Sequence, residues 1–121
     1  MKAKHYQDLV VWQRSMEVAK LTYLIVKKLP KEETYSISDQ MRRAAVSIPS
    51  NIAEGHARNS TKEFIHFLSI ANGSKAELQT QLMICVQVGY LVDTDISELI
   101  SKLDEVGRMI HALSRALKTA P

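Results

Sequence analysis

Hydrophobic residues recur every three to four positions along most of the chain, which is the spacing of one face of an α-helix. Neither the alternating pattern of a strand nor a repeat of fixed period is found. The chain therefore predicts an all-α protein, an antiparallel up-and-down four-helix bundle that forms one domain over residues 1–121. We expect the helices to run from near Asp8 to before Pro30, from Ser36 to about Gly55–Asn59, from Ser60 to Gly89, and from Asp95 onward.

The first expected helix carries apolar residues on two sides. One ridge contains Leu9, Trp12, Met16, Ala19, Tyr23 and Val26, and the other contains Val10, Val11, Val18, Leu21, Ile25 and Leu29. A helix in a monomeric bundle needs one apolar ridge, so the second ridge predicts contact with another subunit. The residues that we expect at this interface are Val11, Val18, Leu21 and Ile25. The alternative is a helix buried centrally within its own chain.

The second expected helix contains Pro49, which removes a backbone donor and predicts a kink. A polar ridge of Arg43, Ser47, Asn51 and Glu54 lies on one side of it. Ser and Asn are poor helix formers, so a buried or interfacial hydrogen-bond network is favoured, in which Arg43 pairs with Glu54 or with Glu77 of the third helix. The alternative is a solvated face with weak ion pairs.

Two features stand out in the third helix. Ser60 and Glu63 have the spacing of a capping box, in which each residue bonds the other at the start of a helix. Gly73 lies in the helix interior, where glycine costs about 1 kcal/mol relative to alanine. Close approach of a neighbouring helix at Gly73 is the expected reason, with Ala44, Ala45 and Ala53 as the matching small surface.

Composition and charge narrow the class of protein. The 121 residues include 16 Lys and Arg against 13 Asp and Glu, which gives a formal charge of +3. This balance permits contact with phosphates without requiring it. Cys85 is the only cysteine and falls in an apolar helical run, which indicates a buried thiol. No apolar run is long enough to span a membrane, and no leader pattern begins the sequence, so we expect a cytoplasmic protein.

Signatures of enzymes are sparse. The sequence has no glycine-rich phosphate loop, no nucleophile elbow and no paired-histidine metal helix. His5, His56, His66 and His111 lie in different segments, and no histidine lies on the helix face of Ser47 and Ser50 to activate them. We therefore expect neither catalysis nor a metal or cofactor.

Basic residues are the remaining candidates for a binding site. Two groups fit phosphate contacts: Lys2, Lys4, Lys27, Lys28 and Lys31 around the first helix, and Arg108, Arg115 and Lys118 in the fourth. The alternative is ordinary solvation, because Asp104 stands at salt-bridge spacing from Arg108 and Lys118 suits a helix C-terminus. Aromatic residues do not alternate with these cations along the chain, which argues against a stacking platform for single strands.

Several segments together resemble a known family. They are Asp8–Trp12, Leu29–Glu33, Arg42–Gly55 and Phe64–Leu78. The segment RRAAVSIPSNIAEG, Arg42–Gly55, resembles the signature of proteins encoded within intervening sequences of bacterial 23S ribosomal RNA. This family resemblance implies a four-helix bundle. It also extends to the accessory protein of diversity-generating retroelements, a pentamer that binds nucleic acid and a reverse transcriptase.

The residues and the resemblance lead to one expectation of function. We expect a non-enzymatic, pentameric scaffold that binds RNA or DNA through Lys27, Lys28, Lys31, Arg108, Arg115 and Lys118. The alternative is a protein–protein interaction module that makes no direct contact with nucleic acid. The family resemblance also implies a reverse transcriptase as a partner.

Overall fold

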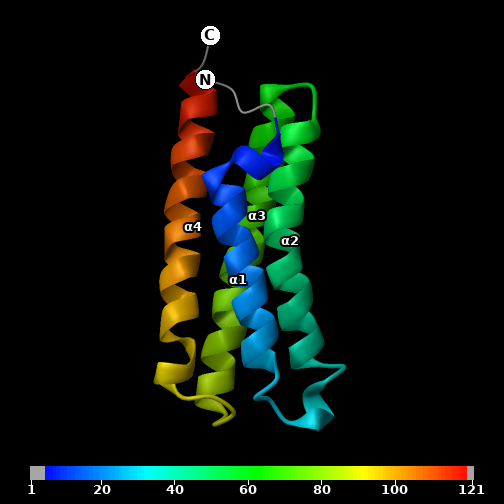
Figure 1. Cartoon of the computed structure of the whole chain (residues 1–121), viewed down its shortest axis with the longest axis vertical. Helices are drawn as coiled ribbons and strands as arrows, with labels where there is room; N and C mark the ends of the chain where they lie inside the picture. The colour runs from blue at the N-terminus through cyan, green and yellow to red at the C-terminus, as the bar shows by residue number, and fades with distance from the viewer. Residues whose placement is uncertain (1–4, 120–121) are drawn as a thin grey trace.

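The computed structural model describes residues 5–119, and within this range the chain forms helices and no strands. Four α-helices are joined by short connections (Figure 1). They are α1 (Val10–Val26), α2 (Ile37–Ala57), α3 (Thr61–Gln87) and α4 (Asp93–Thr119). Two single 3-10 turns, η1 (Tyr6–Asp8) and η2 (Lys31–Glu33), precede α1 and α2. The predicted four-helix bundle is confirmed.

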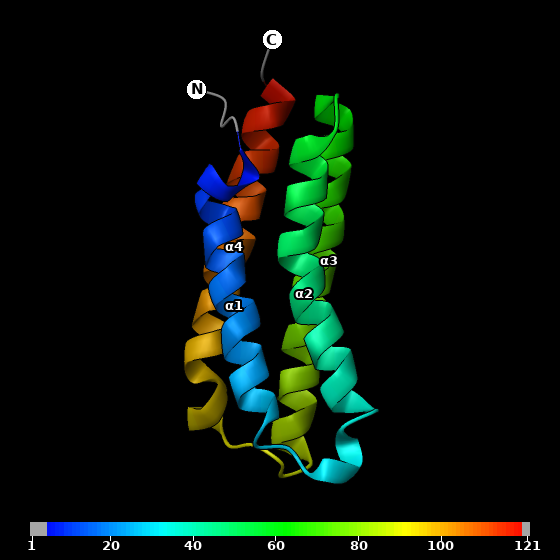
Figure 2. The ribbon, with the colours of Figure 1, turned by 45° about the vertical axis from the view of Figure 1, so that its right-hand side comes forward.

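The helices stand at the four corners of the bundle. Helix α1 packs against α2 and α4, and α3 packs against the same two helices, so the α1–α2 side is opposite the α3–α4 side. The colour gradient in Figures 1 and 2 shows that the chain direction reverses from each helix to the next. The connections after α2 and α3 require this arrangement, because a chain of a few residues cannot return along the length of a helix.

The core face of α1 differs from the one expected. It consists of Val11, Ser15, Val18, Thr22 and Ile25, all buried. The two hydroxyl residues occupy core positions because Ser15 Oγ donates to the carbonyl of Val11 (2.7 Å) and Thr22 Oγ1 donates to that of Val18 (2.8 Å). Their polar groups are thus satisfied within the helix, and the alternating spacing of four and three residues matches a bundle seam.

The interface predicted on α1 must therefore be corrected. Val11, Val18 and Ile25 retain 4%, 0% and 6% exposure within the single chain, so a second subunit cannot contact them. They belong to the core, as the alternative interpretation held. Leu21 is half-buried and packs against this core. The apolar residues of α1 that remain exposed are Val10, Met16, Tyr23 and Leu24.

Helix ends agree with the sequence in part. Glu63 N donates to Ser60 Oγ (3.1 Å), which confirms the cap of α3, and Gly89 follows α3 with a positive φ of 86°. Asp8 instead lies in η1, and Leu9 precedes α1 without a side-chain cap. Helix α2 starts after Ser36 as expected, but the Ser36 hydroxyl bonds Glu33 rather than capping α2. Helix α4 starts two residues before Asp95, and α2 continues through Pro49 without interruption.

Close approach between α2 and α3 occurs at Gly55, not at Gly73. A Cβ added to Gly55 would lie 2.8 Å from Phe67 Cβ and 3.3 Å from the carbonyl oxygen of Phe64. A Cβ added to Gly73 would have no neighbour within 4 Å. The small residue that lets these helices pack is therefore near the end of α2, and Gly73 faces open space.

Candidate nucleic-acid interface

A shallow groove of about 610 Å³ runs between α3 and α4. Six of its eight lining residues have polar side chains; the full set is Asn72 and Lys75 from α3, and Asp104, Gly107, Arg108, His111, Ala112 and Arg115 from α4. Arg108, His111 and Arg115 follow one another at intervals of three and four residues, so α4 presents them as one strip. We call this feature the α3–α4 groove.

Gly107 allows a cation of α3 to reach across α4. A Cβ at Gly107 would lie 2.6 Å from Lys75 Nζ and 3.1 Å from its Cδ, so the lysine side chain occupies the space that the missing methyl group leaves. The positive charge of Lys75 is thereby held beside the strip that contains Arg108. Side chains from two helices contribute to one basic surface.

The cations of the α3–α4 groove lack acidic partners. Within residues 5–119, no carboxylate lies within 4.0 Å of the charged nitrogens of Lys75, Arg108 or Arg115. Asp104 lines the same groove, yet its Oδ1 accepts a hydrogen bond from Gln79 Nε2 (3.0 Å) instead of pairing with Arg108. The salt bridge that the spacing of Asp104 and Arg108 permitted is therefore absent.

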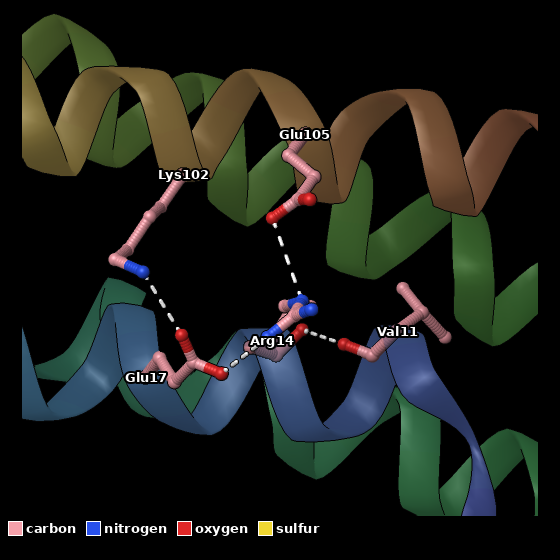
Figure 3. A network of polar contacts seen from close by, with 6 residues as sticks. Val11, Arg14, Glu17, Lys102 and Glu105 are labelled. Carbon is pink, nitrogen blue, oxygen red and sulfur yellow. Dashed lines mark hydrogen bonds and ion pairs between the residues drawn. The ribbon is translucent and has the colours of Figure 1, made fainter.

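The neighbouring α1–α4 face has the opposite character. Figure 3 shows Glu17 between Arg14 and Lys102, with Nη1 and Nζ each 2.9 Å from a carboxylate oxygen. Arg14 Nε also lies 3.7 Å from Glu105. The hydrogen bonds from Lys102 and Arg14 lower the pKa of Glu17, because they stabilise its charged form. The charges of Arg14, Glu17, Lys102 and Glu105 on this face are paired with one another, whereas the cations of the α3–α4 groove have no acidic partner among residues 5–119.

The predicted basic residues divide among three places. Arg108 and Arg115 line the α3–α4 groove, and Lys118 is exposed one turn beyond Arg115. Lys28 Nζ forms an ion pair with Asp95 (2.9 Å), so part of its charge is compensated. Lys27 and Lys31 line a hollow between α1 and α2, on the opposite side of the bundle. The predicted cations among residues 5–119 thus lie on separate surfaces, and Lys2 and Lys4 lie outside the described residues.

Some groove residues were absent from the sequence-based prediction. The α3–α4 groove is also lined by residues that the sequence alone does not predict as nucleic-acid contacts, namely Asn72, Lys75, Gly107 and His111. The spacing of His111 between Arg108 and Arg115 offered a signal for one of them. The contribution of Lys75 and Asn72 depends on the register between antiparallel helices, which periodicity alone does not fix.

The polar ridge of α2 separates into two parts. Ser47 Oγ lies 2.8 Å from Ser74 Oγ, and Asn51 Nδ2 donates to Ser47 Oγ (2.9 Å), which links α2 to α3 by half-buried hydrogen bonds. Arg43, whose side chain is 80% exposed, pairs with Asp39 at 2.9 Å. The predicted pairing of Arg43 with Glu54 or Glu77 is therefore wrong, because the carboxylate of Asp39, one turn earlier on α2, lies within ion-pair distance.

The two predicted acidic partners of Arg43 lie elsewhere. Glu54 pairs with Arg58 (2.6 Å), and Glu77 is exposed on α3. Each is therefore a surface residue of the single chain, outside the Ser47–Ser74 link.

The described part of the chain shows neither a metal-binding cluster nor a membrane-spanning helix. Residues 5–119 contain no group of three or more His, Cys, Asp or Glu side chains placed to hold a metal ion. None of the helices that the structure describes combines the length and hydropathy needed to cross a bilayer.

Comparison with known proteins agrees with the fold. A crystal structure from Bacteroides thetaiotaomicron, described as a protein with unknown function from the S23 ribosomal protein family, superposes with a TM-score of 0.81. The match has 24% sequence identity and covers 88% of this chain and 96% of that one. No protein with a curated description matches the sequence. The sequence model described as 23S rRNA-intervening sequence protein matches residues 7–112, and the chain therefore belongs to the family of 23S rRNA-intervening sequence proteins.

Proposed function

We propose that this protein is a non-enzymatic scaffold, assembled from several copies, that binds nucleic acid through the α3–α4 groove. One observation carries the proposal: Lys75, Arg108 and Arg115 line one groove without an acidic partner among residues 5–119. Elsewhere on the bundle, cations such as Arg14 and Lys102 are paired. A row of unpaired cations along a groove is the arrangement that a phosphate backbone neutralises.

The spacing of the cations suits a phosphate chain. Arg108 and Arg115 are seven residues apart, which corresponds to about 10 Å along a helix. This distance spans roughly two nucleotide steps, and Lys75 adds a third contact from α3. The Asn72 side chain can donate a hydrogen bond to a phosphate or sugar oxygen without adding charge. The contacts are to the backbone, so binding through this groove is expected to depend little on sequence.

Assembly from several copies is supported by an exposed strip on α3. Ile70, Ile84 and Val88 are 38%, 41% and 57% exposed, and Gly73 lies among them with open space at its Cβ position. Because residues 5–119 place no group within 4 Å of the Cβ position at Gly73, a helix of a second copy would explain both the small residue and the apolar strip. Five copies is the number that the family resemblance implies, and each copy would repeat the basic groove.

The nucleic-acid proposal is tested by fluorescence anisotropy with a labelled 20-base-pair RNA duplex and its single strand. Arg108→Gln/Arg115→Gln should weaken duplex binding at least tenfold. Lys20→Gln/Lys62→Gln removes two exposed cations outside the α3–α4 groove and should change affinity less than threefold. For the unmodified protein, the log of the affinity should fall with the log of salt with a slope of about −2 to −3 per copy.

Failure to bind either probe at 50 mM salt would reject nucleic-acid binding and favour the protein–protein module. Equal loss of affinity in both double variants would reject the α3–α4 groove as the site. Light scattering tests the assembly separately: a stable mass of one 13.6 kDa chain at micromolar concentration would contradict it, and five times that mass is expected.

A further inference from the structure

A second groove lies on the opposite side of the bundle, between α1 and α2. Two hollows of about 390 and 460 Å³ share Tyr23 and Arg42 in their linings, so they are neighbouring parts of one feature, the α1–α2 groove. Val26 and Leu29 are buried and form part of its apolar floor. The sequence prediction placed no aromatic residue among the cations, but folding brings Tyr23 of α1 beside Arg42 of α2.

The ring of Tyr23 has no partner within the described chain. It is 46% exposed, and no residue between 5 and 119 stacks on it or hydrogen-bonds to its hydroxyl. Val46, across the groove on α2, is 42% exposed. A large planar side chain is therefore available to a ligand, with an aliphatic surface beside it. Such an exposed ring next to a hollow differs from isolated surface residues because the hollow offers room for a second flat group.

Positive charge surrounds this ring. Lys27, Lys31, Arg42 and Arg43 line the α1–α2 groove, and Asp39 is the one acidic residue in the same lining. Asp39 lies 2.9 Å from Arg43 and 3.9 Å from Arg42, so both arginines share one carboxylate. Lys27 and Lys31 form no ion pair within residues 5–119. The groove thus combines an unstacked ring with an excess of cations.

We propose that the α1–α2 groove binds single-stranded nucleic acid, with one base stacked on Tyr23 and the flanking phosphates on Lys27, Lys31 and Arg43. This inference rests on the proposed function and adds a second, strand-selective site to it. A nucleotide offers the matching chemistry, because it joins a flat face to an adjacent anion. A purely apolar segment would bury the cations without partners, and a duplex keeps its base faces stacked inside the helix and away from Tyr23.

The first test compares a labelled 12-nucleotide oligoadenylate with a 12-base-pair RNA duplex by anisotropy on the full chain. Tyr23→Leu keeps an apolar side chain and removes the stacking face, so single-strand affinity should fall roughly 5- to 100-fold while duplex affinity is retained. Tyr23→Phe keeps the ring and should bind within about twofold of the unmodified protein. Because Tyr23 is half exposed, both variants are expected to fold, and matching circular dichroism spectra and melting temperatures establish this.

Direct contact is tested by photocrosslinking with a single strand that contains 5-iodouridine. The crosslinked peptide should contain Tyr23, and a crosslink confined to α3 or α4 would overturn the inference.

Unchanged single-strand affinity in Tyr23→Leu, or an equal loss for the duplex, would also overturn it. If Arg108→Gln/Arg115→Gln loses binding while Tyr23→Leu does not, the α3–α4 groove stands and this second site falls. If the unmodified protein binds neither probe, both proposals fail. Displacement of the single strand by a 12-residue polyglutamate at equal concentration would assign the groove to acidic peptides instead.

Discussion

Cys85 lies in the core of the bundle, where chemistry at its sulfur is restricted by packing. Its side chain is 0% exposed, and Sγ lies 3.8 Å from the Sδ of Met41 on α2. Burial raises the pKa of the Cys85 thiol because the thiolate would lose its hydration. Alkylation requires a thiolate that the reagent can reach. The folded protein therefore slows the reaction in two ways, by burying Sγ and by raising the pKa of the thiol.

We therefore predict that iodoacetamide at pH 8 labels Cys85 at least about 100-fold more slowly than an exposed cysteine. The reaction is followed by mass spectrometry. Val92→Cys in a Cys85→Ala background is the control, because Val92 is 60% exposed in the connection between α3 and α4. Equal labelling rates in the two proteins would mean that α3 opens readily, contrary to the packed core described above.

Substitution by alanine should change the stability of the bundle in opposite directions at Gly55 of α2 and at Gly73 of α3. Gly55→Ala places a methyl group 2.8 Å from Phe67 Cβ, next to backbone that cannot move freely, and should lower the free energy of unfolding by about 1–3 kcal/mol. Gly73→Ala meets no atom within 4 Å and removes a poor helix former, so it should raise the stability of a single chain by up to about 1 kcal/mol.

Urea unfolding followed by circular dichroism measures both glycine variants, each against the unmodified chain. The sign of the difference tests the packing of these helices. If Gly73→Ala also lowers the free energy of unfolding, and the loss grows with protein concentration, then Gly73 packs against a second copy. A loss independent of concentration would contradict the open space found around Gly73.

At the scale of helices, most of the architecture could be predicted from apolar spacing, and the exceptions have identifiable causes. On α1, Ser15 and Thr22 occupy core positions because their hydroxyls bond carbonyls in the preceding turn, so hydrophobicity alone assigned the core face to an interface. Near the candidate site, Asp104 bonds Gln79 on α3 and leaves Arg108 unpaired. Spacing within one helix predicts partners on that helix, such as Arg108 for Asp104, whereas the partner of Asp104 in the structure is Gln79 of α3.

For the whole molecule, three carboxylates connect parts of the chain that are distant in sequence. Glu17 joins α1 to α4 through Lys102. At the end of the bundle with the two loops, Tyr90 donates to Glu33 at 2.6 Å, and Asp95 accepts from Lys28 at 2.9 Å. The pKa of each carboxyl is lowered: that of Glu17 mainly by Lys102, that of Glu33 by Ser36 and then Tyr90, and that of Asp95 by the Val92 amide and then Lys28.

These lowered pKa values predict an acid-dependent stability. Since Glu17, Glu33 and Asp95 bind protons more readily in the unfolded chain, their contribution is complete above their ordinary pKa values near 4 and is lost as the pH falls further. The Tm should therefore change little between pH 7 and 5 and fall between pH 4.5 and 2.5. Glu17→Gln/Glu33→Gln/Asp95→Asn should start from a lower Tm at pH 7 and show a shallower fall. Glu77→Gln, at an exposed position, is the control and should keep the full fall of the Tm. If the Tm of the triple variant falls as steeply as that of the unmodified protein, other carboxyls govern acid unfolding.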